Sequence, residues 1–442
     1  MPTTNGRWPT VQFTDERLPN GLRLVMSPDS LAPVASVNVW YNVGSRHEAP
    51  GQTGLAHLFE HMMFQGSRNV AKAEHFRLIA GAGGTLNGTT WNDRTNYFET
   101  VPSHHLELAL WLEADRMGTL LDALGQETLD NQRDVVKNEK RQTYDNRPYG
   151  TSSERLQAQV FPADHPYHHT TIGSMADLDA ATLEDVQAFF RTYYAPNNAV
   201  LSIVGDFEPA QARAWVERYF GPIPAFPNLP TPPDGRVQPK IGAEYREVIP
   251  DRVPMSRIYF AFRTPPLGTT AFDALAMATA VLSEGKASRL YSRMVRDSLL
   301  AQDVGLGPYE WVGGATMTLG WATAASEDTV DNTEAAFLET VQSLADTPPT
   351  ADEMARARAL VERQELDALQ RAGERADRLS MYATLFDDPG MTNDRLPALL
   401  AVTPEEASQA VADTLTEDNR VVLTFVPRRT KEPDREPERD PE

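Results

Sequence analysis

The chain has 442 residues, of which 41% are hydrophobic and 23% charged, a balance typical of folded proteins and enough material for two or more domains. The formal net charge is −21, so the mean field of the protein repels phosphate and argues against a nucleic-acid partner, whereas an acidic cavity would attract cationic substrates. No cysteine is present, which excludes disulfides, thiolate metal ligands and a cysteine nucleophile.

No stretch of the sequence approaches the roughly 20 apolar residues of a membrane span, so no membrane association is expected. The segment that begins at Met1 lacks the basic start and the apolar run of a signal peptide. The expected location is therefore the cytoplasm by default, or the periplasm or the cell exterior if a signal peptide has been removed.

The first half of the sequence predicts strands, then long helices, then a further strand. Val37, Val39 and Tyr41 recur with the period of two that is typical of a half-buried strand. Helices are predicted over residues 54–64, 104–121 and 128–144. Because these elements cluster without strict strand–helix alternation, the sequence favours an α+β fold with a mostly antiparallel sheet.

The apolar, helix-compatible segment 54–64 contains His57, Glu60 and His61. Histidines four residues apart lie on the same helix face, so both imidazoles can reach one metal ion, and Glu60 borders that face as a proton acceptor. The order is the reverse of the common His-Glu-x-x-His zinc protease motif. Ordinary helix residues are the alternative, but burying two imidazoles and a carboxylate is costly unless a metal satisfies them.

A catalytic zinc site needs a third protein ligand, and Glu139 follows His61 by 78 residues. With this spacing the sequence resembles the pitrilysin family of inverted-motif zinc peptidases, which includes insulin-degrading enzyme and the mitochondrial processing peptidase. The resemblance implies one Zn²⁺ per chain, bound by His57, His61 and Glu139, with Glu60 as the general base. Cobalt or manganese could occupy the same ligands.

Residues 83–97 resemble the Gly-Gly-x-x-Asn-Ala-x-Thr edge strand on which that family binds its substrate. The resemblance implies that an extended peptide adds to this strand, with Asn87 holding its backbone near the metal. Gly88 replaces the usual alanine, and Gln132 stands where the family often has a second glutamate that supports the site. A glycine-rich strand of purely structural use is the alternative.

Other histidines lack a ligand spacing. His75 has no partner at such a distance along the chain, and His168 and His169 are adjacent, so that their side chains point in different directions. The adjacent pair is expected at the surface or at a helix end.

The strongest domain boundary is a segment with six prolines between residues 222 and 233, which predicts a stiff linker. The second half repeats the first at an offset near 221, since Thr182 and Thr403 each precede a helix and Asn198 and Asn419 each precede a strand. We therefore predict a zinc-binding catalytic domain over residues 1–221, a linker over 222–236, a homologous domain without metal over 237–427 and a disordered tail over 428–442. The resemblance implies two tandem duplicated domains of the LuxS/processing-peptidase-like metallohydrolase type, each a mostly antiparallel sheet packed with helices.

The second half carries no metal motif: the positions that match the metal motif are near Met277, Ala280 and Val281. Active single-chain members of the family present an arginine there and a tyrosine seven residues later, which grip the substrate. Here Arg296, a candidate substrate-binding residue, is followed at that spacing by Asp303, and Tyr309 lies too far on. Because an aspartate opposes a developing oxyanion, we expect a homologous partner subunit, in a heterodimer or a homodimer, to supply the missing pair.

The predicted function, as the resemblance implies, is that of a zinc-dependent endopeptidase that hydrolyses peptides or unfolded segments in an enclosed chamber. A non-catalytic core or scaffold subunit of a processing-peptidase-like complex is the alternative from another class, and the presence of the complete metal motif argues against it. A dedicated precursor-processing peptidase is a third option that the sequence does not separate from general peptide degradation.

Overall fold

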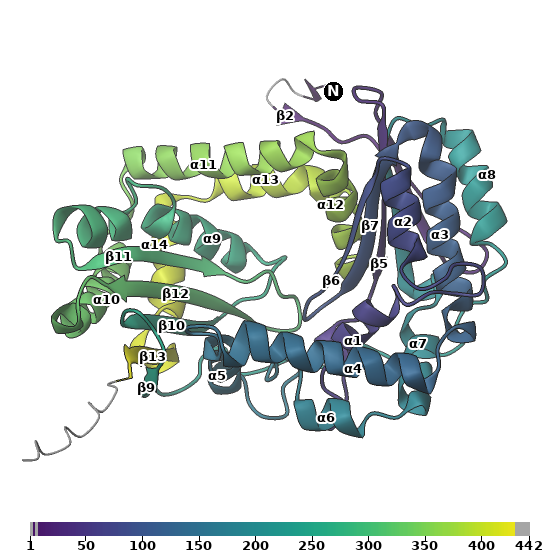
Figure 1. Cartoon of the computed structure of the whole chain (residues 1–442). Helices are drawn as coiled ribbons and strands as arrows, with labels where there is room; N and C mark the ends of the chain where they lie inside the picture. Colours follow the sequence, from purple (N-terminus) through teal and green to yellow (C-terminus); the bar gives the residue numbers. More distant parts are fainter. Residues whose placement is uncertain (1–2, 5–7, 429–442) are drawn as a thin grey trace, which may run out of the picture.

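The computed structural model describes residues 3–4 and 8–428, and it consists of two halves, each built around one sheet (Figure 1). The first sheet has the strand order β3-β4-β8-β5-β7-β6, and every pair is antiparallel except β4 and β8. Its strands are β3 (Thr14–Arg17), β4 (Arg23–Pro28), β5 (Val34–Tyr41), β6 (Thr85–Thr90), β7 (Thr95–Pro102) and β8 (Ala199–Gly205). Two further strands, β1 (Thr3–Thr4) and β2 (Trp8–Pro9), pair with each other.

The second sheet has the order β11-β12-β10-β13-β9, with β13 and β9 as its parallel pair. Its strands are β9 (Tyr245–Asp251), β10 (Arg257–Thr264), β11 (Ala301–Pro308), β12 (Thr316–Ala324) and β13 (Arg420–Pro427).

The two sheets share one topology and one register. Strand order β4-β8-β5-β7-β6 in the first half corresponds to β9-β13-β10-β12-β11 in the second. Val39 pairs with Leu201, and Phe260 pairs with Val422, so both partners shift by the same offset of 221. The predicted fold of two related α+β domains, each a mostly antiparallel sheet packed with helices, is confirmed. The boundaries at residues 221 and 237 stay a prediction, and the predicted tail, apart from Arg428, lies outside the described residues.

Helices pack on both sheets. In the first half they are α1 (Leu55–Met62), α2 (Glu74–Gly81), α3 (Leu106–Thr119), α4 (Gln126–Lys140), α5 (Ser152–Val160), α6 (Met175–Ala180), α7 (Leu183–Tyr193) and α8 (Pro209–Tyr219). In the second half they are α9 (Thr270–Ser283), α10 (Val330–Asp346), α11 (Ala351–Gln370), α12 (Ala372–Leu385), α13 (Met391–Ala401) and α14 (Pro404–Thr414). Thr182 and Thr403 close capping boxes at the starts of α7 and α14, as the repeat predicts. Among the described residues, none of these helices is long and apolar enough to cross a membrane.

Each half lends one helix to the other. α12, from the second half, packs on β5 and β8 of the first sheet, whereas α5, from the first half, packs on β10 and β13 of the second (Figure 1). Trp40 and Leu379 meet in the apolar cluster under α12, and Leu156 and Phe425 meet under α5. Strand β5 is therefore buried on both faces, where the sequence predicted a half-buried strand.

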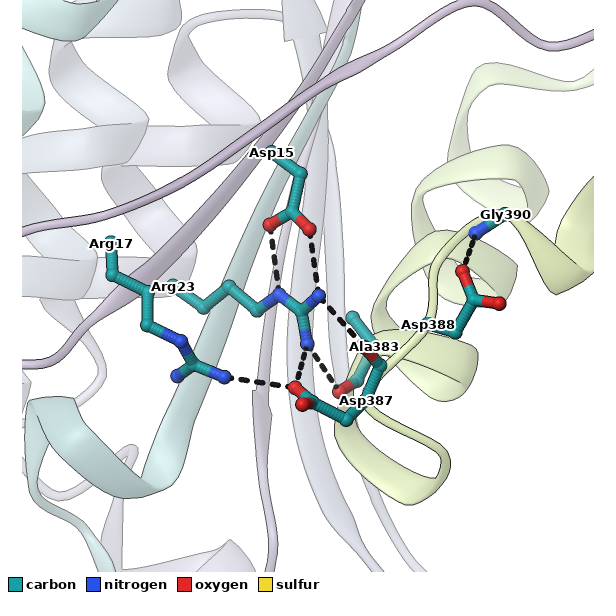
Figure 2. Close-up of polar contacts among 7 residues, drawn as sticks. All are labelled: Asp15, Arg17, Arg23, Ala383, Asp387, Asp388 and Gly390. Carbon is teal, nitrogen blue, oxygen red and sulfur yellow. Dashed lines mark hydrogen bonds and ion pairs between the residues drawn. The ribbon is translucent and has the colours of Figure 1, made fainter.

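Polar contacts fix the C-terminal end of α12 to the first sheet (Figure 2). Arg23 of β4 donates two hydrogen bonds to Asp15 (2.8 and 2.7 Å), one to Asp387 Oδ1 (2.6 Å) and one to the carbonyl of Ala383 (2.9 Å). Arg17 donates to the same Asp387 oxygen at 2.9 Å. Because Arg23 is buried, these bonds give α12 one defined position on the sheet.

The exchange of helices predicts that the two halves unfold together. Leu379, fully buried between α12 and the first sheet, is the residue to test. We expect Leu379→Ala to lower the free energy of unfolding by about 2–5 kcal/mol. Both circular dichroism and tryptophan fluorescence in urea should move to the same lower midpoint. Arg363→Ala, whose side chain is 62% exposed on α11, should change stability by less than about 0.5 kcal/mol. Separate transitions for the two halves would contradict the exchange.

Candidate metal centre

His57 and His61 lie one turn apart on α1 and face Glu139 near the end of α4. Their Nε2 atoms are 3.7 and 3.3 Å from Glu139 Oε2, and one potential ligand atom from each residue lies within 4.8 Å of the others. Burial lowers the pKa of His57 to about 4, and the hydrogen bond from His61 lowers the pKa of Glu139. Near neutral pH His57 is thus neutral and Glu139 ionised, the forms that bind a metal. Two imidazoles and one carboxylate at these distances fit a three-ligand zinc site.

Glu60 is half-buried on α1 between the two histidines in sequence. Burial raises its pKa, while the nearby Thr90 hydroxyl and the charges of His61 and Arg94 oppose the rise. A carboxylate with a raised pKa is better suited to accept and return a proton. The structure thus brings Glu60 into the electrostatic range of His61 and Glu139.

Strand β6 forms the free edge of the first sheet, beside α1 (Figure 1). Asn87 is exposed on this strand, while Gly88 is buried and pairs with Tyr97. A Cβ atom on Gly88 would lie 3.0 Å from the Tyr97 ring and 3.2 Å from the Phe64 ring. Two aromatic rings therefore fill the space that an alanine methyl group would need, which explains the glycine at this position.

Gln132 is buried on α4, two turns before Glu139. Its side-chain amide donates to Asn131 Oδ1 at 2.8 Å. Since Gln132 is neutral and makes this bond, it adds no charge to the site.

Among the described residues, neither Arg296 nor Asp303 has a hydrogen bond or an ion pair with a metal-ligand candidate. The Arg296 side chain is 57% exposed, at the π-helical turn η6 (Tyr291–Asp297), and donates to Asp297 at 2.8 Å. Asp303, on the edge strand β11, accepts a hydrogen bond from Trp321 at 2.9 Å and lies 3.5 Å from Arg257. Both groups are thus engaged with residues of their own half.

Tyr309 lies directly after β11. Its ring stacks on Trp311, with the centroids 4.9 Å apart. Burial raises the pKa of Tyr144, which follows α4, and the charges of Glu154, Glu139 and Tyr309 add to the rise.

Two residues that the sequence reasoning missed hold the start of α1. The buried Glu48 carboxylate accepts hydrogen bonds from the backbone N–H groups of Gly54 (2.9 Å) and Ala56 (2.8 Å). His169 donates its Nε2 proton to Glu48 at 2.9 Å, so that it is a half-buried ion-pair partner and not a free surface residue as expected. A carboxylate at the N-terminal end of a helix satisfies its free N–H groups and its dipole. No spacing in the sequence connects Glu48 with His169.

A second group of potential ligand atoms, His75, Glu99 and Glu113, is buried behind β7. His75 Nε2 lies 2.8 Å from Glu99, and Arg116 forms a bidentate ion pair with Glu113. Burial raises the pKa of Glu113 to about 8 and lowers that of His75 to about 3. One shared proton neutralises two carboxylates and one guanidinium, whereas a divalent cation would leave a positive charge buried. The group is therefore an ion-pair cluster and not a metal site.

Loss of the Glu48 carboxylate should loosen the metal-binding helix. We expect Glu48→Ala to weaken zinc binding by about 10- to 100-fold, because the first turn of α1 loses its acceptor next to His57. Competition with a chromophoric chelator measures this change. Glu184→Ala, which removes an exposed carboxylate from the first turn of α7, should leave the affinity unchanged. Equal zinc affinity in both variants would contradict the role of Glu48.

The ion-pair cluster predicts a pH dependence of stability. The folded-state pKa of Glu113, about 8, exceeds its ordinary value of 4.5, so the folded state retains a proton that the unfolded state releases between these values. Stability therefore falls as the pH rises through this window. Glu99→Gln removes one carboxylate. We expect its free energy of unfolding, measured by urea titration, to rise relative to that of the parent protein by about 1 kcal/mol or more from pH 5 to pH 8. The exposed Glu127→Gln should follow the parent at both pH values. A constant difference between the parent and Glu99→Gln would contradict the shared proton.

Family models and relatives match this architecture. The model described as insulinase (peptidase family M16) matches residues 23–171, which include all three metal-ligand candidates, and the peptidase M16 inactive domain matches residues 180–361. A zinc protease of Helicobacter pylori named PqqE is 33% identical over 288 residues, which are 64% of either chain. A probable mitochondrial-processing peptidase subunit beta of Arabidopsis thaliana is 27% identical over 247 residues, 55% of this chain and 45% of that protein.

A solved structure of a protease from Helicobacter pylori superposes with a TM-score of 0.87 at 25% identity, covering 95% of this chain and 100% of that one. The "inactive domain" description falls on the half whose helix α9 carries the buried apolar residues Met277, Ala280 and Val281 in place of the motif. The two models between them cover most of residues 23–361. The first lies within the first half, and the second begins before α7 of that half and extends through most of the second half. The chain therefore belongs to the M16 family of insulinase- and pitrilysin-like peptidases.

Proposed function

We propose that the chain is a zinc-dependent endopeptidase that hydrolyses peptides or unfolded segments bound as an added strand on β6. The observation that carries this proposal is the convergence of His57, His61 and Glu139 next to Glu60 and beside a free sheet edge. The names of relatives such as the zinc protease PqqE support the same chemistry.

In this proposal His57, His61 and Glu139 would hold one Zn²⁺. The ion would lower the pKa of a water molecule towards about 7 and polarise the scissile carbonyl. Glu60 accepts the proton of the attacking water on its carboxylate and later delivers it to the nitrogen of the leaving amine. The raised pKa of Glu60 favours this transfer, because a more basic carboxylate takes up the proton of the water more readily.

The edge strand sets the class of substrate. A strand that adds to β6 uses backbone hydrogen bonds, which all extended peptides offer whatever their sequence. Asn87, exposed on β6, is placed to contact the backbone of such a peptide. Folded proteins present few free strands, so peptides and unfolded segments are the preferred substrates.

We further propose a homologous partner subunit that contributes an arginine and a tyrosine to the site. The engagement of Arg296 with Asp297 and of Asp303 with Trp321 and Arg257 supports this, because these groups are occupied within their own half. The partner gives a heterodimer, or a homodimer if a second copy uses Tyr309. The compartment, cytoplasmic unless an export signal has been removed, stays a prediction.

A metal-dependent hydrolysis assay tests the function. We expect Glu60→Gln to reduce cleavage of a quenched fluorescent peptide library by about 100- to 10,000-fold while it keeps one zinc per chain. Removal of the metal with a chelator should abolish cleavage, and added zinc should restore it. Glu127→Gln, on the exposed side of α4, serves as the control and should cleave normally.

The same assay separates the alternatives. Full activity of the isolated chain would contradict the need for a partner subunit. Stoichiometric zinc without cleavage, followed by cleavage after addition of a homologous subunit, would support it. A chain that binds no zinc would instead be a scaffold subunit, and the endopeptidase proposal would fail.

A further inference from the structure

A cavity of about 730 Å³ lies between the first sheet and the start of α12, on the sheet face opposite α1. We call it the α12 cavity. Its wall combines both halves of the chain, since the sheet and the β6–β7 turn come from the first half and residues 370–377 from the second. The polar residues of its wall include Thr85, Thr89, Arg94, Asn96 and Asp377.

The cavity adjoins the free edge on which a peptide would lie. Thr85 and Thr89 of β6 line it, and their pairing partners on β7 are Thr100 and Asn96, which line it too. Successive side chains of a strand point to opposite faces of a sheet. A strand added to β6 therefore directs every second side chain to the face that carries this cavity.

Most charges in the cavity wall are already paired. Arg375 binds Asp29 at 2.7 Å, and Arg371 lies 3.4 Å from Glu374. Asp377 is satisfied as well, because its Oδ1 accepts hydrogen bonds from Asn38 (3.1 Å), Trp40 (2.8 Å) and Asn96 (2.9 Å).

Arg94 is different. Within the described part of the chain it has no carboxylate at ion-pair distance, although Asp377, Glu60 and Asp93 attract it from farther away. Its Nη1 donates to the carbonyl of Thr89 and to Asn96 Oδ1, each at 3.0 Å. Burial lowers its pKa to about 10, which leaves the guanidinium charged at neutral pH.

Aromatic rings frame the same group. The guanidinium carbon of Arg94 lies 5.0 Å from the centroid of the Trp40 ring and 5.5 Å from that of Trp91. Trp91 is 49% exposed, unusual for so large an apolar side chain, and it also lines the cavity. A fixed cation beside an exposed ring can bind a carboxylate and cover its aliphatic stem.

We propose that the α12 cavity is a carboxylate subsite in which Arg94, with Trp91 beside it, binds an acidic side chain or the C-terminal carboxylate of a peptide on β6. The inference rests on the proposed function only in placing the peptide on that edge. It gives the site a local preference opposite to the one that the net charge of −21 suggests. Arg94 acts here as a specificity residue.

Peptide selection tests the subsite without catalysis. The Glu60→Gln protein, loaded with zinc, is incubated with a randomised decapeptide library made both as free acids and as C-terminal amides, and the retained peptides are sequenced. Enrichment of Asp or Glu at one position identifies a side chain as the source of the carboxylate. Retention of free acids over amides identifies the C-terminus. In either case the carboxylate should strengthen binding of a selected peptide about tenfold or more, measured by fluorescence anisotropy.

Three variants on the same background assign the effect. Arg94→Gln should remove the preference for the carboxylate, whereas Arg371→Gln, which alters a paired arginine of the same cavity, should keep it. Gly373→Phe should block the cavity, because Gly373 lines it. The substitution fits without a clash, since a Cβ there would lie 3.7 Å from Thr100 Oγ1 and 3.9 Å from Ser36 Oγ. Zinc content should stay unchanged in all three.

Equal retention of acids and amides without enrichment of Asp or Glu, retention of no peptide at all, or a preference that survives in Arg94→Gln would overturn the subsite. The hydrolysis assay decides the proposed function separately. A protein that selects carboxylates through Arg94 but cleaves nothing would keep the subsite and lose the peptidase.

Discussion

The exchange of α5 and α12 between the halves is the constraint on which the rest of the structure depends. Each sheet needs cover on its second face, and each obtains it from the other half. The exchange fixes the position of β5 and β8, against which β7 and then the edge strand β6 are aligned. The free edge, the helix α1 with its candidate metal ligands and the α12 cavity thus have fixed positions relative to one another.

Charged groups fix the positions of α1 and β7 at the candidate metal centre. The Glu48 carboxylate holds the first turn of α1, and burial keeps His57 neutral. The ion-pair cluster fixes strand β7. Its Arg116 guanidinium contacts the ring of Tyr97, the residue of β7 that pairs with Gly88. Charged groups that do no chemistry therefore set the positions of those that can.

The sequence predicted what depends on local spacing. His57 and His61 share a helix face, a pattern that four residues define, and the repeat offset of 221 was visible in two helix starts and two strand starts. Glu139 came from a family resemblance, and the structure brings it to the histidines. Glu48 and His169 were missed because they meet only through the tertiary fold, 121 residues apart.

Burial on the second face of β5 was missed for the same reason. Asn38 and Trp40 bind Asp377, more than 330 residues further along the chain. Polar residues on a strand predict exposure unless a distant partner satisfies them, and no alternation within the strand can reveal such a partner.

The long sequence separation between α12 and the sheet that it covers has a consequence for how the chain folds during synthesis. The apolar cluster of Val25, Trp40 and Val200 belongs to strands that leave the ribosome early, but its cover, residues 372–385, emerges near the end. Until then a hydrophobic sheet face stays open to neighbouring nascent chains, a condition that favours aggregation. We therefore expect the chain to mature slowly and to need chaperones until α12 packs on the sheet.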